Sequence, residues 1–217
     1  MDILELMKRR HSVRQYKTDR IEDEKRAELD SLCREINEKS GMSIRIVYDE
    51  PVCFDSPMAH YGKFTGCRNY IDVIGPKGAD LDEKAGYYGE QLVLKAQELG
   101  LNTCWAALTH GKSAAKPGPG EKSSIIIALG YGQHRGLPRK SRPVSEVSNM
   151  TDNSPEWFRR GMEAVMLAPT AVNQQHFRVN LAEDGSVSIR STGGICSKID
   201  LGIVKWHFEA VTGVKAL

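Results

Sequence analysis

The chain has 217 residues, of which 40% are hydrophobic and 27% are charged, the usage of an ordinary globular protein. Its 30 Lys and Arg residues exceed its 28 Asp and Glu residues by only two, so bulk charge does not favour a nucleic-acid partner. No apolar run approaches the ~18 residues of a membrane span. Five scattered cysteines without a C-x-x-C pair indicate a reduced, cytoplasmic protein.

Apolar spacing, glycines and prolines divide the first half of the chain into elements. The pattern predicts helices over 2–10 and 22–38, a strand over 44–49, a loop over 50–69, a strand over 69–75 and a helix over 80–99. Gly100 suits the left-handed position that follows a helix.

The second half begins with an extended stretch over 102–108 and a loop over 110–123. A wholly apolar strand over 124–132 leads into a polar connection over 133–154, and Ser154-Pro155 then opens a helix that runs to residue 168. Strands over 176–181 and 186–190 form a hairpin, and the last helix starts near Lys198. This order predicts an α+β fold, a mixed sheet flanked by helices.

Two helices carry glycines at the same separation, one from Gly89 to Gly100 and the other from Gly202 to Gly213. Each helix follows a strand region. The pattern suggests a chain of two related halves.

Three segments carry residues suited to anion or cofactor binding. They are R-R-H-S-V-R-Q-Y over 9–16, L-P-R-K-S-R-P over 137–143 and A-P-T-A-V-N-Q-Q-H-F over 168–177. Each has an ordinary structural interpretation by itself, because basic residues favour helix C-termini and proline-rich basic loops are commonly solvated connections.

Together, the order and spelling of these segments resemble the FMN-dependent nitroreductase family. The first segment is similar to that family's R-[RH]-S-x-[RK]-x-[FY] signature, the second to its P-x-K-x-R-x-P stretch, and the third to its A-P-S-x-x-N-x-Q-P-W block. The segment G-L-N-T-C-W-A-A-L over 100–108 follows a long helix, as a comparable loop does in that family. The resemblance covers essentially the whole chain.

The chain departs from the family pattern in two respects. The third segment usually follows the first two helices, whereas here it lies near the C-terminal end, and His176-Phe177 replaces Pro-Trp. The resemblance therefore implies a rearranged subgroup. Residues 1–150 would form a first nitroreductase-like half with the FMN phosphate site, and residues 151–217 a partial second half that supplies the ring-covering segment.

The resemblance implies FMN as cofactor and NADH or NADPH as electron donor. It implies ping-pong hydride transfer to nitro compounds, quinones or similar electron-poor small molecules. No catalytic side chain and no metal ligand are expected, because the flavin carries the chemistry. The residues implied in cofactor binding are Arg10, His11, Ser12, Arg14, Ala107, Leu108, Lys140, Arg142, Thr170, Asn173 and Gln175.

Alternatives remain open at this point. The same fold supports other flavin reactions such as dehydrogenation or dehalogenation, or a flavin- or anion-binding protein without turnover. An RNA-binding surface is disfavoured, because only Tyr16 offers an aromatic ring among the basic residues. The chain could be a monomer that completes the site in cis, or a homodimer.

Overall fold

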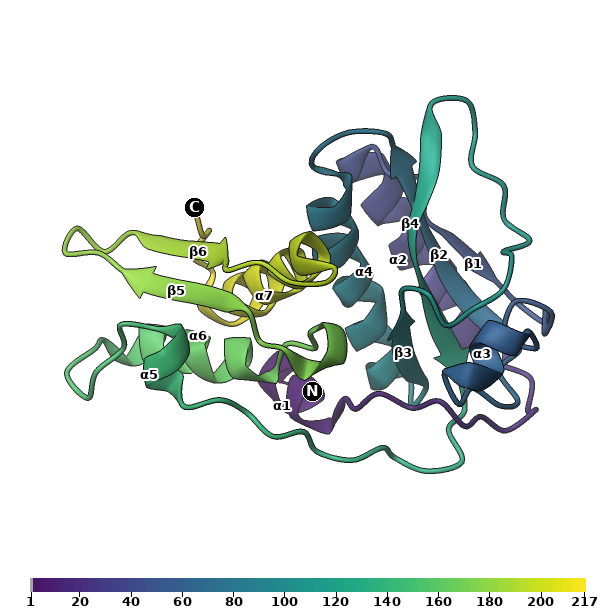
Figure 1. Cartoon of the computed structure of the whole chain (residues 1–217), viewed down its shortest axis with the longest axis horizontal. Coiled ribbons are helices and arrows are strands. Elements are labelled where there is room, and N and C mark those ends of the chain that lie inside the picture. The colour runs from purple at the N-terminus through teal and green to yellow at the C-terminus, as the bar shows by residue number, and fades with distance from the viewer. Residues whose placement is uncertain (1) are drawn as a thin grey trace. The chain divides into compact units, whose positions relative to one another are not determined.

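The computed structural model describes residues 2–217, which form two compact units (Figure 1). Unit 1 contains the N-terminal residues through Lys8 together with 82–91 and 139–217, and unit 2 contains 9–81 and 92–138. The units are interleaved along the sequence, and helix α4 (Leu81–Glu98) contributes residues to both. The division into related halves over 1–150 and 151–217 stays a prediction.

Unit 2 is built on a four-stranded sheet. Its order is β1 (Arg45–Val47), β2 (Asn69–Pro76), β4 (Glu121–Gly130) and β3 (Asn102–Ala106), and neighbouring strands are antiparallel. The central strands β2 and β4 are apolar and buried over most of their length, which explains why both could be predicted from their composition. Isolated parallel bridges join Ser12 to Thr103 and Gln15 to Thr65, so parallel and antiparallel pairing both occur. The predicted α+β class is confirmed.

Helices α2 (Asp23–Ser40) and α3 (Pro57–Tyr61) complete the regular structure of unit 2, together with the second half of α4. Helix α3 lies in the segment expected to be a loop. Its start has an ordinary explanation, since the Ser56 hydroxyl accepts the Ala59 N–H at 3.2 Å and Pro57 occupies the first turn. The prolines and glycines of this stretch predicted a loop, but the stretch contains a short helix with a capped N-terminus.

Unit 1 combines helices with a two-stranded hairpin. Its elements are α1 (Ile3–Arg9, in unit 1 through Lys8), α5 (Val144–Val147), α6 (Glu156–Leu167), the 3₁₀ turn Ala171–Asn173, β5 (Phe177–Leu181), β6 (Val187–Ser191) and α7 (Ser197–Thr212). The hairpin has the predicted turn, with Val179 opposite Ile189. Helix α6 begins one residue later than expected: Pro155 is its N-cap, while the Ser154 hydroxyl accepts the Thr151 N–H instead.

Helices α4 and α7 approach closely at two glycines of unit 1. A Cβ atom on Gly86 would lie 2.0 Å from the Ile199 carbonyl oxygen, and one on Gly202 would lie 1.9 Å from the Glu83 carbonyl oxygen. Gly202 belongs to the glycine pattern seen in the sequence, but Gly86, its counterpart at this crossing, does not. The glycines at the crossing are therefore required by backbone packing.

A buried histidine links three helices of unit 1. The His207 ring on α7 places Nδ1 2.9 Å from the Ala164 carbonyl oxygen on α6 and Nε2 2.9 Å from the Glu90 carboxylate on α4. Both side chains are fully buried. The two contacts give both ring nitrogens and the Glu90 carboxylate a polar partner, without which these groups would be costly to bury.

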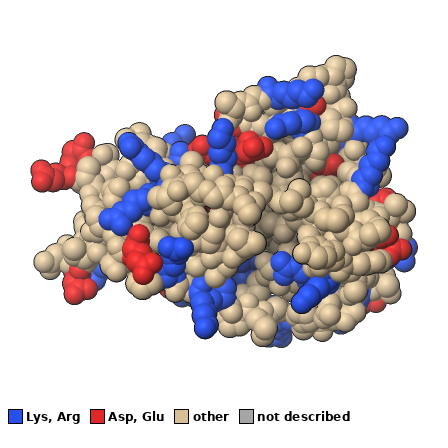
Figure 2. All heavy atoms as spheres, in the orientation of Figure 1, with Lys and Arg blue, Asp and Glu red and all other residues tan. Residues whose placement is uncertain are grey.

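Charges on the face shown in Figure 2 are mixed: Lys and Arg side chains alternate with uncharged surface and with Asp and Glu. Within residues 2–217, none of the helices has the length and apolar character needed to cross a membrane. The same residues contain no group of three or more His, Cys, Asp or Glu side chains arranged to hold a metal ion.

Candidate functional site

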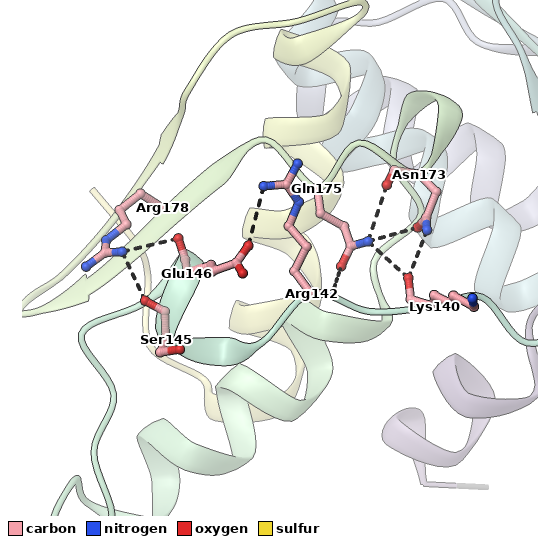
Figure 3. Close-up of polar contacts among 7 residues, drawn as sticks. All are labelled: Lys140, Arg142, Ser145, Glu146, Asn173, Gln175 and Arg178. Atoms are coloured by element: carbon pink, nitrogen blue, oxygen red, sulfur yellow. Dashed lines mark hydrogen bonds and ion pairs between the residues drawn. The ribbon is translucent and has the colours of Figure 1, made fainter.

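Residues 139–143, here called the basic segment of unit 1, are held by the side-chain amide of Gln175 (Figure 3). The Gln175 Oε1 atom accepts the Arg142 N–H at 2.9 Å, and Nε2 donates to the Lys140 carbonyl oxygen at 3.1 Å. One side chain thus makes the two hydrogen bonds that a neighbouring β-strand would make with residues i and i+2. Gln175 is only 3% exposed, so this pairing is protected from water.

A second amide adds to this arrangement. The Asn173 Nδ2 group donates to the same Lys140 carbonyl at 2.8 Å, and its Oδ1 atom accepts from Gln175 Nε2 at 3.2 Å. Residues two apart in an extended chain share one side. The Lys140 and Arg142 side chains are both exposed, and the Arg142 guanidinium lies 3.7 Å from the Glu146 carboxylate. The segment therefore carries two exposed cations, and side-chain amides hold its backbone at both of these residues.

The two ends of the basic segment are anchored as well. Arg139 donates to the Ala168 carbonyl at 2.5 Å and to the Met166 carbonyl, at the end of α6. Beyond Pro143, Arg178 donates to the Ser145 and Glu146 carbonyls at 3.4 and 3.2 Å (Figure 3). A guanidinium beside the last carbonyls of a helix satisfies acceptors that have no partner within that helix.

The segment that supplies these amides, residues 170–175, has an unusual backbone. Val172, Asn173 and Gln175 have positive φ angles of 45°, 56° and 50°. Such angles are uncommon outside glycine, and for the β-branched Val172 they are strained. The Thr170 hydroxyl stabilises the turn by accepting the Gln175 N–H at 3.0 Å. Strain of this kind clusters at functional sites.

Asp200, in the first turn of α7, contacts the same segment. Its carboxylate accepts the Ala171 N–H at 2.9 Å and the Gln174 side-chain amide at 2.7 Å. Asp200 lies outside the three motifs and was not among the predicted site residues. An acidic residue in the first turn of a helix is common for electrostatic reasons alone, so its sequence position gave no indication of this role.

Residues 10–16 are called the basic segment of unit 2. Here the backbone is held by other backbone groups. Ser12 forms a parallel bridge with Thr103 on β3, and the Val13 N–H donates to the Thr103 carbonyl at 3.1 Å. The Tyr16 N–H donates to the Thr65 carbonyl at 2.8 Å. The alternation of this extended stretch buries Val13 completely and leaves Ser12 and Arg14 exposed.

Three of the predicted cofactor-binding residues interact with one thiol in unit 2. Burial raises the pKa of Cys104, while Arg14, a Ser12 hydrogen bond and Arg10 act in the opposite direction, because all three lie close to the sulfur. Arg10 itself is 6% exposed. Cys104 is 1% exposed and belongs to the buried core of unit 2. Arg10, Ser12 and Arg14 thus share an interaction with the Cys104 thiol.

The remaining predicted residues of unit 2 lie near strand ends. His11 packs against Gly136, where an added Cβ atom would lie 2.6 Å from the His11 Cβ. Ala107 and Leu108 directly follow β3, whose pairing with β4 ends at Ala106, so neither belongs to that ladder. Both are exposed, Leu108 by 74%.

The predicted cofactor residues therefore form two groups, one in each unit. Unit 2 contains Arg10, His11, Ser12, Arg14, Ala107 and Leu108, and unit 1 contains Lys140, Arg142, Thr170, Asn173 and Gln175. The donor chemistry of both groups fits FMN, because guanidinium, ammonium and hydroxyl donors match a phosphate dianion. In unit 1 the Asn173 and Gln175 amides bind backbone groups of the chain, so they position the cations Lys140 and Arg142.

Comparison with known proteins gives the family. A family model described as "Putative TM nitroreductase" matches residues 2–212. A solved "putative nitroreductase" from Thermotoga maritima has a TM-score of 0.69 at 24% identity, covering 97% of this chain and 83% of that chain. Two structures named "Putative NADH dehydrogenase/NAD(P)H nitroreductase" are also similar. The structure from Bacteroides thetaiotaomicron has a TM-score of 0.52 at 20% identity, covering 67% of this chain and 95% of that chain. The structure from Parabacteroides distasonis has a TM-score of 0.51 at 22% identity, covering 71% and 99%.

At these identities the structural matches show the fold. A comparison with curated protein sequences finds no match. The family match, by contrast, spans nearly the whole chain and includes all three motif segments. The chain therefore belongs to this nitroreductase family and is an oxidoreductase of the nitroreductase type.

Proposed function

We propose that the chain is an FMN-dependent oxidoreductase that uses NADH or NADPH to reduce nitro compounds, quinones or similar electron-poor molecules. The observation that carries the proposal is the basic segment of unit 1, whose exposed Lys140 and Arg142 are fixed by Gln175. Fixing the backbone of two cations in advance lowers the entropic cost of binding a dianion. A connection that merely joined two elements would not need a buried amide paired to it at two points.

The basic segment of unit 2 supports the same cofactor class. Arg10, Ser12 and Arg14 supply a guanidinium, a hydroxyl and a second guanidinium within one short segment, and all three interact with the Cys104 thiol. Charge-assisted hydrogen bonds from such groups are about twice as strong as neutral ones, which suits a phosphate-bearing flavin better than riboflavin. Arg14 also lies over the Phe64 ring at 5.9 Å, a contact that keeps this cation in place.

FMN, when bound, would supply the two-electron redox chemistry between the nicotinamide donor and the electron-poor acceptor. The protein's part is to bind and orient the cofactor. We propose that Arg14 stabilises the negative charge of the reduced flavin and that backbone groups of Ala107 and Leu108 orient the ring. No protein acid or base is assigned, because the chemistry resides in the cofactor. The donor class agrees with the names of the two NAD(P)H nitroreductase structures.

The test is anaerobic reduction of the FMN-reconstituted protein. NADH or NADPH should bleach the flavin absorbance, and a nitroaromatic compound or a quinone should restore it, with the donor product released before the acceptor reacts. Initial rates at several fixed acceptor concentrations should give the parallel double-reciprocal lines of a ping-pong cycle. A flavin that binds but is bleached by neither donor would instead support a flavin-binding protein without this activity.

A further inference from the structure

Asp200 is a buried carboxylate with three hydrogen bonds to the strained segment 170–175. It is 5% exposed. The Ala171 N–H lies 2.9 Å from Oδ1 and 3.2 Å from Oδ2, and the Gln174 amide donates to Oδ2 at 2.7 Å. All of these residues belong to unit 1. An ionised carboxylate accepts only, and each of these contacts supplies a donor.

The segment needs such support because its own backbone is unfavourable. Left-handed φ angles cost roughly 1–2 kcal/mol per residue outside glycine, and Val172, Asn173 and Gln175 all have them. Val172 is 84% exposed, so burial of its side chain does not offset the strain. Strained residues of this kind persist only where surrounding contacts hold them.

We propose that Asp200 is a positioning residue for the cofactor site: its carboxylate holds Ala171 and Gln174 and so keeps Asn173 and Gln175 on the backbone of Lys140 and Arg142. Hydrogen bonds connect α7 to segment 170–175 through Asp200, and segment 170–175 to the basic segment of unit 1 through Asn173 and Gln175 (Figure 3). The inference rests on the proposed function only where FMN affinity is measured.

The electrostatics make this support dependent on pH. Burial raises the pKa of Asp200 to about 6, while the hydrogen bonds from Gln174 and Ala171 and the charge of His176 act in the opposite direction. Cys196, at the N-cap of α7, is the other titratable group facing Asp200, and burial together with Asp200 raises the pKa of its thiol. The positive end of the α7 dipole also favours the ionised carboxylate.

Acidification has opposite effects on the local order of segment 170–175 and on the contribution of Asp200 to global stability. A carboxyl group whose pKa is raised by folding binds more protons in the folded state between pH ~4 and ~6, so its contribution to global stability falls as the pH rises through that window. The bonds to Ala171 and Gln174, in contrast, favour the ionised form. Acidification from pH 7 to pH 5 should therefore loosen segment 170–175 without Asp200 destabilising the protein as a whole.

Hydrogen exchange on the full-length, FMN-free protein tests this. The measured quantity is the protection of the Ala171 amide, corrected for the intrinsic effect of pH. In the wild type, protection should fall about tenfold between pH 7 and pH 5, since charge-assisted hydrogen bonds are being weakened. In Asp200→Asn it should be low at both values. The matched control is Asp184→Asn, an exposed carboxylate that accepts the Ser186 N–H at 2.9 Å in the β5–β6 turn and should leave Ala171 unchanged.

A second variant keeps the test decisive if Asp200→Asn does not fold. Gln174→Met removes a hydrogen bond that lowers the pKa of Asp200, so the midpoint of the protection change should move to higher pH. An unchanged midpoint in Gln174→Met, or wild-type protection of Ala171 in a folded Asp200→Asn, would overturn the proposal.

FMN affinity gives the second readout, by quenching of flavin fluorescence. Asp200→Asn should weaken FMN binding about tenfold at pH 7 and should reduce its change between pH 7 and pH 5 to the part that comes from protonation of the FMN phosphate. Asp184→Asn should bind as the wild type does. If Asp200→Asn binds FMN with wild-type affinity and pH dependence, Asp200 has no positioning role. If the wild type binds no FMN at all, the proposed function fails, and the exchange experiment still decides the role of Asp200.

Discussion

Each basic segment carries exposed cations, Arg14 in unit 2 and Lys140 and Arg142 in unit 1, but the two backbones are held by different bonds. In unit 2, Ser12 and Val13 are tied to Thr103 of β3 through the backbone, so side-chain substitutions leave the scaffold in place. In unit 1, the backbone of Lys140 and Arg142 depends on the side chain of Gln175. We therefore expect the backbone of the basic segment of unit 2 to tolerate side-chain substitutions, and the backbone of the basic segment of unit 1 to depend on a few amides.

The largest effect is expected from Gln175→Met. The variant removes both hydrogen bonds from Gln175 to the basic segment: the Arg142 N–H loses its Gln175 acceptor, and the Lys140 carbonyl keeps only the bond from Asn173. We expect the free energy of unfolding to fall by about 2–3 kcal/mol and FMN affinity to fall more than about 100-fold. Urea denaturation and flavin fluorescence measure the two quantities.

Gln133→Met is the matched control in unit 2. The Gln133 amide donates to the Tyr16 carbonyl at 3.1 Å, but backbone pairing already holds this segment. The expected cost is within about 0.5 kcal/mol, with FMN affinity unchanged. Equal losses for Gln133→Met and Gln175→Met would remove the distinction between the two segments.

Removal of single cations should have the next largest effect. Arg10→Ala and Arg142→Ala should each weaken FMN binding by about 1.5–3 kcal/mol, the range for hydrogen bonds to charged groups. Riboflavin, which lacks the phosphate, is the control ligand and should lose much less affinity. If FMN and riboflavin lose equally, these residues support the fold and do not bind phosphate.

A smaller effect is expected where packing holds the basic segment of unit 2. Gly136 has a φ of 76°, and a Cβ atom there would lie 2.6 Å from the His11 Cβ and 3.1 Å from the Ser12 carbonyl oxygen. Gly136→Ala should displace residues 11–12 and weaken FMN binding by roughly fivefold, about 1 kcal/mol.

Gly185→Ala is the matched control for backbone strain. Gly185 has a φ of 84°, but no atom lies within 4 Å of its added Cβ. Both variants should lose roughly 1 kcal/mol of stability through the positive φ. Only Gly136→Ala should change FMN affinity, and a similar change in Gly185→Ala would attribute the effect to general destabilisation.

Much of the fold could be predicted from periodicity. The long helices α2, α4, α6 and α7, the buried strands and the β5–β6 hairpin all lie where the pattern put them, within a few residues. Short elements were harder. Helices α3 and α5 have five and four residues, too few for a 3.6-residue period to be recognised. Strand β4 begins at Glu121, earlier than the predicted residue 124. Its first residues are solvated and lack the apolar run that marks the rest of the strand, so the pattern did not include them.

The candidate site divides in the same way. Motifs located both basic segments and the amide-bearing segment, because their residue types and order are specific. They did not reveal that Gln175 acts on the backbone or that Asp200 supports it, since these contacts join residues 26 to 35 positions apart. The glycine pattern likewise identified Gly202 but not Gly86, because only the helix crossing makes them counterparts.

The most direct test of the central claim is the flavin content of the purified full-length protein. Heat release followed by chromatography should give FMN, at one molecule per chain after reconstitution, and neither FAD nor riboflavin should replace it with equal affinity. A colourless protein that cannot be reconstituted with FMN would contradict the account.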